Sequence, residues 1–130
     1  MTAARPGYRD GVALFEREGV KEWLYCLVEE DGGDRVRAAL DEVLSVRPGD
    51  RISDACVECA LAAAEVVATC AGAHADEPPP LVLGYAEDCG VPSDELLASA
   101  FQAVQRIALE PELRDVEVVD LEQRLASVAA

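Results

Sequence analysis

Two cysteines three residues apart have the spacing in this sequence that most directly suggests chemistry. Cys56 and Cys59 form a C-x-x-C pattern, which occurs in zinc sites and in thiol–disulfide catalysts. A structural zinc site needs four ligands, so Cys26, Cys89 or His74 would have to complete the set from other parts of the chain. Because no second C-x-x-C pair is present, we predict no metal site.

A redox function is the second interpretation of this pair. Cys56 falls in the first turn of an expected helix, where the helix dipole would lower the pKa of the thiol. The βαβ pattern of thioredoxins is absent, however, and cysteine is also one of the most commonly buried small residues. Two interpretations of Cys56 and Cys59 therefore stay open: core packing, which we favour, and a thiol-dependent redox or metal-handling pair.

Motifs for catalysis are otherwise missing from the sequence. The single histidine, His74, stands near Asp76 and Glu77, but no nucleophile or second base is close to it in the sequence. We interpret it as an exposed loop residue. The chain has no glycine-rich phosphate loop, no G-x-S-x-G and no H-E-x-x-H. We therefore predict no catalytic residues, no cofactor and no enzymatic activity.

Acidic residues dominate the charge. The formal net charge is −15, which argues against nucleic acid and anionic membranes as partners. No Lys or Arg occurs between Arg51 and Arg106. We predict a surface for a basic protein partner from the carboxylates of this stretch, with a merely solubilising role as the alternative. The candidate partner-binding residues are Asp54, Glu58, Asp76, Glu77, Glu87, Asp88, Asp94 and Glu95.

The candidate residues must be positioned around one segment, from Ser53 to Gly72. We expect a helix with Ser53 as its N-cap and Gly72 just past its last turn. Its charges fall on a narrow stripe, and its other residues are mostly Ala, Val, Cys and Leu. A helix that is apolar around most of its circumference must be enclosed by other helices.

Glu65 lies in the most apolar part of this segment. Because it shares a stripe with Asp54 and Glu58, we expect it to be partly exposed. A buried carboxylate would need a partner, and in that case Arg106 or Arg114 should reach it.

Composition supports a helical fold for the whole chain. Of its 130 residues, 51% are hydrophobic but only 5% are aromatic, so the core must consist of Ala, Leu and Val. No long alternating run suggests a strand. We predict a single-domain, all-α bundle of five to six helices packed around residues 53–72. The domain spans 11–130, after a flexible N-terminal arm at 1–10.

Breakers and caps predict where the other helices begin and end. We expect Gly19 to interrupt a short turn at 11–18, a helix from Val20 to the Asp31–Gly33 stop, and a helix capped by Asp34. After three prolines we expect a short helix at 81–88, followed by one capped by Ser93.

The last helix contains an ambiguity. Val118-Val119 interrupts its pattern with β-branched residues, and Asp120 with Gln123 resembles a capping box. We expect either two helical pieces or one bent helix.

The start of the chain has no secretory signal pattern, and no segment is apolar enough to span a membrane. Five cysteines, an odd number, are typical of reduced thiols. We therefore expect a cytoplasmic protein.

Three segments together resemble a known family. They are E-W-L-Y-C-L-V-E-E-D-G-G-D-R-V-R-A-A-L-D-E-V-L at 22–44, C-A-L-A-A-A-E-V-V-A at 59–68 and A-V-Q-R-I-A-L-E-P-E-L-R at 103–114. The chain resembles the small acidic bacterial proteins catalogued as domain of unknown function 4259. The chain departs from that family in two places. The family usually opens with Trp-Gly followed by Phe-Asp-Asn, which is missing here, and it has a Trp-containing stretch at the place of residues 116–119. The resemblance implies an all-helical domain and brings no activity with it.

These observations predict a non-catalytic, acidic protein-binding protein. Its most specific form is an inhibitor or immunity protein that docks on a basic partner such as a toxin or nuclease, helped by electrostatic steering. The alternatives are the thiol-dependent function of Cys56 and Cys59, and a small helical structural subunit or homodimer that associates through the Leu/Val stripe of the last helix.

Overall fold

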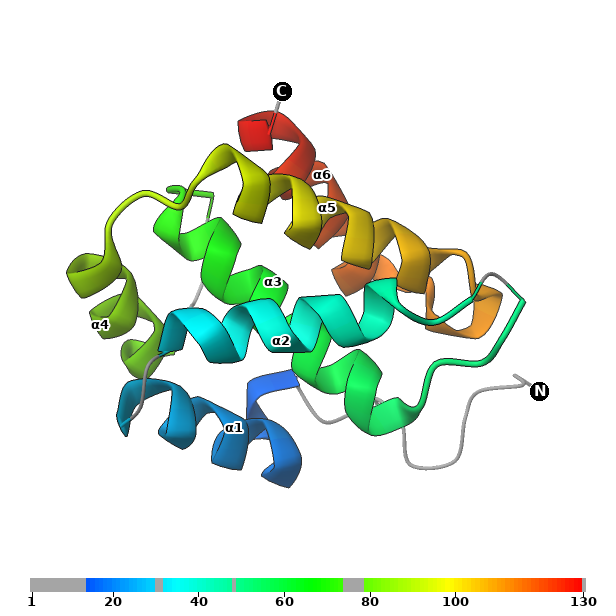
Figure 1. The fold of residues 1–130 in the computed structure, drawn as a ribbon, viewed down its shortest axis with the longest axis horizontal. Coiled ribbons are helices and arrows are strands. Elements are labelled where there is room, and N and C mark those ends of the chain that lie inside the picture. Colours follow the sequence, from blue (N-terminus) through cyan, green and yellow to red (C-terminus); the bar gives the residue numbers. More distant parts are fainter. Residues whose placement is uncertain (1–13, 30–31, 48, 74–78, 130) are drawn as a thin grey trace.

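The structure is a computed structural model, described for residues 14–29, 32–47, 49–73 and 79–129. Within these ranges it consists of α-helices and two 3₁₀ turns, without a β-strand, and the predicted all-α fold is confirmed (Figure 1). The helices are α1 (Glu18–Glu29), α2 (Gly32–Leu44), α3 (Asp54–Cys70), α4 (Pro80–Cys89), α5 (Asp94–Ala108) and α6 (Val116–Ala129). The 3₁₀ turns are η1 (Leu14–Glu16) and η2 (Pro111–Leu113).

Two predicted segments lie outside the described residues. They are the N-terminal arm at 1–10 and the loop that contains His74, Asp76 and Glu77. Among the helices that are described, none has both the length and the apolar character needed to cross a membrane.

Both ends of α3 have the caps that the sequence predicts. The Ser53 hydroxyl accepts a hydrogen bond from the Cys56 N–H at 3.2 Å. At the other end the Gly72 N–H donates to the Thr69 carbonyl, and the Ala73 N–H donates to the Ala68 carbonyl. This is a Schellman motif, and it requires the positive φ of +88° that Gly72 adopts.

Helix α3 packs against every other α-helix and against η1. In Figure 1 it runs behind α2 through the middle of the molecule, with α1 on one side and α5 and α6 on the other. Its buried side chains are small, so neighbouring helix backbones can approach closely. They are Val57, Ala60, Leu61, Ala62, Ala63, Ala64, Val66, Val67, Ala68 and Thr69.

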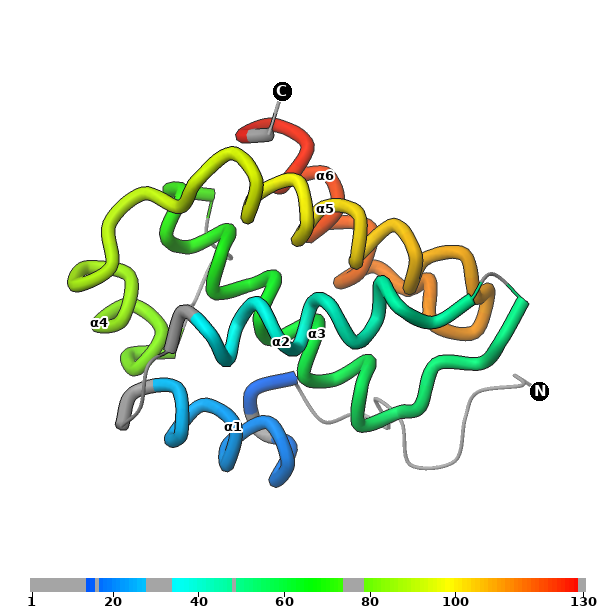
Figure 2. The backbone as a smooth tube through the Cα atoms, in the orientation of Figure 1, coloured from blue at the N-terminus to red at the C-terminus, as the bar shows by residue number. Residues whose placement is uncertain are grey.

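The remaining helices form antiparallel neighbours around α3. Figure 2 shows the chain reversing its direction between α1 and α2, between α2 and α3, and between α5 and α6. Each of these pairs is in contact. Short connections between antiparallel helices are the usual topology of a bundle, and here they bring apolar stripes from all helices onto α3.

Two predicted boundaries in the first half of the chain are wrong. Gly19 lies inside α1, which begins at Glu18, and α2 begins at Gly32, so Asp34 occupies its first turn and is not its cap. A glycine costs only about 1 kcal/mol in a helix, and burial of the apolar stripe of each helix outweighs that cost. The carboxylate of Asp34 still favours the helix because it lies near the positive end of the dipole.

The last helix is continuous from Val116 to Ala129. The Asp115 carboxylate accepts a hydrogen bond from the Val118 N–H at 3.0 Å, as an N-cap side chain does. Of the two alternatives, the new start at Asp120 is therefore wrong, and the segment forms a single helix. Val118 is buried against the core, and this packing overrides the weak helix preference of a β-branched residue.

The cap of α3 gives a stability prediction. Ser53→Ala removes the acceptor for the Cys56 N–H and should lower the free energy of unfolding by about 1 kcal/mol. Ser53→Asn keeps an acceptor and should cost less than half of that. Urea unfolding followed by circular dichroism measures both. Equal losses in the two variants would show that the cap contributes nothing.

Candidate functional site

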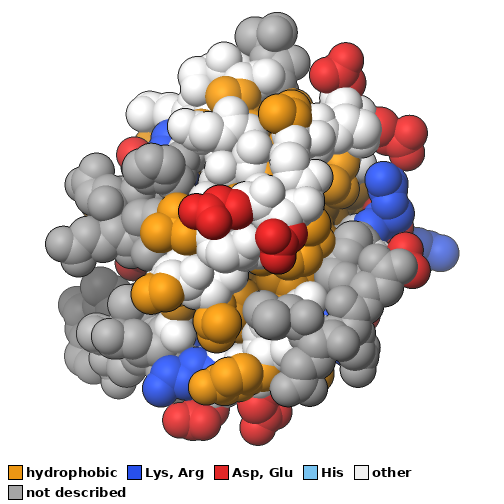
Figure 3. Space-filling model, turned by 90° about the vertical axis from the view of Figure 1, so that its left-hand side faces the viewer, with side chains coloured by type: hydrophobic (Ala, Val, Ile, Leu, Met, Phe, Trp, Pro, Cys, Tyr) orange, Lys and Arg blue, Asp and Glu red, His pale blue; other side chains and the backbone are white. Residues whose placement is uncertain are grey.

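Four of the predicted acidic residues lie close together in the chain and are exposed. Glu87 and Asp88 end α4, and Asp94 and Glu95 begin α5 after a short connection. We call these four residues the acidic surface. Figure 3 shows the side of the molecule on which α4 lies, with acidic side chains among hydrophobic ones at its centre, and both acidic and basic side chains near its edges.

One cation from another helix reaches this surface. Arg37 of α2 donates to Glu95 at 3.3 Å, but both side chains are largely exposed. A pair of this kind contributes little to stability and is easily exchanged for another partner. Glu95 therefore stays available to an incoming basic group.

The two predicted residues at the start of α3 lie elsewhere. Glu58 accepts a hydrogen bond from Arg17 at 3.0 Å, and their side chains are only 17% and 10% exposed. Asp54 occupies the first turn of α3, which Figure 1 shows on the opposite side of the molecule from α4. Asp54 and Glu58 therefore do not extend the acidic surface.

The environment of the C-x-x-C pair opposes thiol reactivity. Both Cys56 and Cys59 are partly buried free thiols. Burial, followed by the charge and the hydrogen bond of Glu42 on α2, raises the pKa of Cys56 to about 11. Burial also raises the pKa of Cys59, with the carboxylates of Glu42 and Glu58 adding to the effect. The lowered pKa of Cys56 that the redox interpretation needs is not found, because burial and Glu42 outweigh the helix dipole.

A metal site does not form around these thiols in the part of the chain that the structure describes. No group of three or more His, Cys, Asp or Glu side chains is placed there to hold an ion. Cys70 lies at the far end of α3 from the pair, and burial raises its pKa to about 11 as well.

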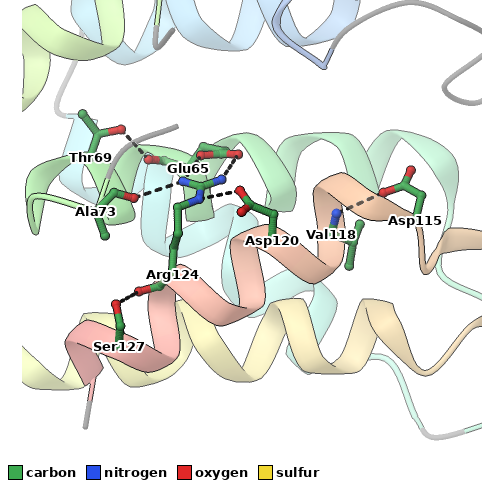
Figure 4. Close-up of polar contacts among 8 residues, drawn as sticks. All are labelled: Glu65, Thr69, Ala73, Asp115, Val118, Asp120, Arg124 and Ser127. Carbon is green, nitrogen blue, oxygen red and sulfur yellow. Dashed lines mark hydrogen bonds and ion pairs between the residues drawn. The ribbon is translucent and has the colours of Figure 1, made fainter. Parts of the chain in front are cut away.

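A charged centre that the sequence analysis missed joins α3 to α6. Arg124 forms a two-pronged ion pair with Glu65, with both N–O distances at 2.9 Å, and donates to the Ala73 carbonyl at 3.0 Å (Figure 4). Its Nε also donates to Asp120 at 2.7 Å. The Glu65 and Arg124 side chains are 14% and 17% exposed, so Glu65 is partly exposed as expected, although mostly covered, and its arginine partner is neither of the two that we named.

Arg106 and Arg114, which we named as partners of Glu65 if it were buried, do not pair with it. Arg106 donates to the carbonyls of Arg47 and Asp50 and lies 3.7 Å from Glu110, so it holds the α2–α3 connection against the end of α5. Arg114 is exposed. The i, i+4 spacing of Asp120 and Arg124 indicates that Asp120 can orient the Arg124 guanidinium. Nothing in the sequence, however, indicates that Arg124 contacts Glu65, which is 59 positions away.

The pKa of Arg124 is raised, although burial alone would lower it. The hydrogen bonds and charges of Glu65 and Asp120 outweigh the burial. A cation whose pKa rises on folding stabilises the fold at every pH below its unfolded pKa and loses that effect only as the pH rises through the folded pKa. Arg124 therefore stays charged across the whole range in which proteins are normally studied.

A cavity of about 290 Å³ lies between the α2–α3 connection and the end of α5. Arg106 and Glu110 line it, but both already bind within the fold: Arg106 as described above, and Glu110 by accepting from the Ile52 N–H at 3.2 Å. These two side chains therefore connect the α2–α3 connection to the end of α5 at this cavity.

Three arginines are thus enclosed, each together with a carboxylate partner, whereas Lys21, Arg47, Arg51 and Arg114 are exposed. Arg17, Arg106 and Arg124 are each at most 17% exposed and form ion pairs inside the fold. The carboxylates of the acidic surface face outward. Comparison of the chain with protein-family models, curated proteins and solved structures finds no match. The resemblance to domain of unknown function 4259 therefore stays a prediction.

The pKa of Cys56 predicts slow alkylation. A rise from 9.0 to about 11 makes the thiolate roughly a hundredfold scarcer at pH 8, and the rate should keep rising with pH up to about 11. Mass spectrometry of iodoacetamide-treated protein measures this, with the exposed Cys89 as internal reference. Glu42→Gln should speed the reaction of Cys56, whereas the neighbouring Asp41→Asn should not. Modification of Cys56 as fast as Cys89 at pH 8 would restore the redox interpretation.

The Glu65–Arg124 pair gives a second prediction. Arg124→Met leaves a mostly buried carboxylate unpaired and should cost about 2–3 kcal/mol of unfolding free energy. The control Asp120→Asn removes an exposed partner and should cost less than about 1 kcal/mol. Combining Glu65→Met with Arg124→Met replaces the ion pair by apolar contacts and should restore much of the loss. Urea unfolding tests this, and a double variant as unstable as the sum of its singles would contradict it.

Proposed function

We propose that this protein is a non-catalytic, acidic binding protein that docks on a basic partner protein. The observation that carries the proposal is the inward placement of Arg17, Arg106 and Arg124, each paired with a carboxylate inside the fold. Every such pair removes one cation from the surface. Each pair also encloses a carboxylate, so the net charge of −15 is unchanged, but the ratio of carboxylates to cations on the outer surface is higher than the composition alone suggests.

The acidic surface is the part of the molecule that best fits such a partner. Glu87, Asp88, Asp94 and Glu95 lie on successive helices within a stretch of sequence that contains no Lys or Arg. A cluster of one sign attracts the opposite charge from a distance and repels nucleic acid and anionic membranes. A protein with exposed Lys and Arg side chains is the complementary partner.

The most specific form of the proposal is an inhibitor or immunity protein for a basic enzyme such as a nuclease toxin. Such an enzyme binds the phosphate backbone through basic residues, and an acidic protein can cover the same residues. Electrostatic steering would give fast capture, which protection of a cell requires. We place this interaction in the cytoplasm, which is consistent with five free thiols.

The test begins with finding the partner and ends with kinetics. A tagged chain is incubated with its native lysate at low and at high salt, and the proposal expects a basic protein that is retained only at low salt. Association with the purified partner is then measured by stopped-flow fluorescence. Glu87→Gln, Asp88→Asn and Asp94→Asn together should slow association about tenfold at low salt and much less at high salt.

A matched variant separates local charge from total charge. Asp34→Asn, Asp41→Asn and Asp50→Asn remove the same number of charges from exposed positions outside the acidic surface. This control should slow association far less. Equal slowing by both variants would show that only the net charge matters, and retention of no basic protein at low salt would contradict the proposal itself.

A further inference from the structure

Helix α4 exposes two leucines on one short uncharged segment. Its first seven residues, P-L-V-L-G-Y-A, contain no charge, yet only Val82 is fully buried. Leu81 and Leu83 are 38% and 40% exposed. Among the elements that the structure describes, α4 has its main contacts with α3 and α1, whereas α5, for example, packs against α2, α3 and α6.

Helical geometry places these leucines on either side of an open face. Successive residues are about 100° apart around a helix, so Leu81 and Leu83 flank the buried Val82 in opposite directions. Gly84 then points outward between them. We call Leu81, Leu83 and Gly84 the outer face of α4. Figure 3 shows this side of the molecule, where hydrophobic side chains are grouped around acidic ones.

Gly84 has no role that the described fold requires. A Cβ atom added to it would meet no atom within 4 Å, and its backbone is that of an ordinary helical residue. Alanine would be the better helix former at such a position. The missing side chain does leave the helix backbone open between two leucines, where a partner can approach closely.

Charge decides which partner fits this face. Glu87 lies one turn beyond Leu83, and Asp88 lies one turn beyond Gly84, so carboxylates border the apolar centre. Two copies of the chain facing each other through α4 would oppose these carboxylates to one another, which is unfavourable for association. An anionic membrane would be repelled for the same reason. A partner that carries apolar side chains beside Lys or Arg meets both features.

We propose that the outer face of α4 binds an amphipathic basic helix of the partner protein. The apolar stripe of that helix lies across Gly84 between Leu81 and Leu83, and its Lys or Arg side chains reach Glu87 and Asp88. Binding of this kind is related to helix-in-groove recognition, in which the bound amphipathic helix carries apolar anchors spaced by one helical turn. The inference rests on the proposed function, because it specifies how the basic partner is held.

The experiment uses a defined probe in place of the unidentified partner. A synthetic leucine–lysine peptide that forms an amphipathic helix is titrated into the full chain, and fluorescence anisotropy measures the affinity. A peptide of the same composition, scrambled so that it forms no apolar stripe, is the control for charge alone. We expect the amphipathic peptide to bind at least tenfold more tightly than the scrambled one.

Glycine variants supply a matched pair. Gly84→Leu fills the outer face and should weaken binding of the amphipathic peptide at least tenfold. Gly19→Leu makes the same change in α1, where an added Cβ also meets no atom within 4 Å, and should leave binding unchanged. Both changes replace an open helical glycine, so both should raise the urea midpoint, which shows that the variants fold. Leu83→Asn should weaken binding as well, whereas the exposed Val116→Asn should not.

The outcomes distinguish this inference from the proposed function. One outcome is that both peptides bind equally, and that Glu87→Gln with Asp88→Asn weakens binding while Gly84→Leu does not. In that case the outer face is not the docking site, although the acidic surface still binds cations. If the basic partner fails to associate with the full chain at low salt, the proposed function fails and the inference with it. A dimer in sedimentation that Gly84→Leu dissociates would overturn the inference in favour of a second copy.

Discussion

The constraint on which this structure depends is the enclosure of α3. Its side chains are mostly Ala, Val and Leu, and nearly all of them are buried, so no face of this helix can be left to water. Every other helix therefore has to supply an apolar stripe to it, and the small alanine side chains let those helices come close. The antiparallel connections in the chain follow from this requirement, since a short loop can only return the next helix along the same core.

Enclosure of α3 also determines what happens to its own charges. Glu58 and Glu65 lie on the one polar stripe of this helix, and neighbouring elements cover that stripe as well. Each carboxylate then needs a cation, which Arg17 supplies from the segment before α1 and Arg124 supplies from α6. Pairs at this depth add little net stability compared with apolar packing, but they penalise any arrangement that leaves one partner alone. They thereby fix how η1 and α6 are seated on α3.

The sequence was informative where a structural signal is local, and uninformative where it depends on distant contacts. The caps of α3 and α5, the proline start of α4 and the apolar stripes follow from neighbouring residues, and all of these were predicted. Gly19 and Asp34 misled us because burial overrides the cost of glycine in a helix. The partner of Glu65 could not be predicted, since choosing Arg124 over Arg106 or Arg114 requires knowing how α6 lies on α3. The raised pKa of Cys56 could not be predicted from its place in the first turn either, because burial by neighbouring helices and then Glu42 from α2 cause it.

The charge of the surface and the exposed side of α4 together determine which partner the molecule can bind. The chain has eleven basic residues, and those that pair with inward carboxylates are lost to the surface. Helix α4 contributes only Val82 fully to the core, so its leucines and its carboxylates share one exposed side. Charge mainly sets how fast two proteins meet, whereas apolar contact mainly sets how long they stay together. A surface that combines the two can capture a basic partner quickly and release it more slowly than an acidic surface alone would.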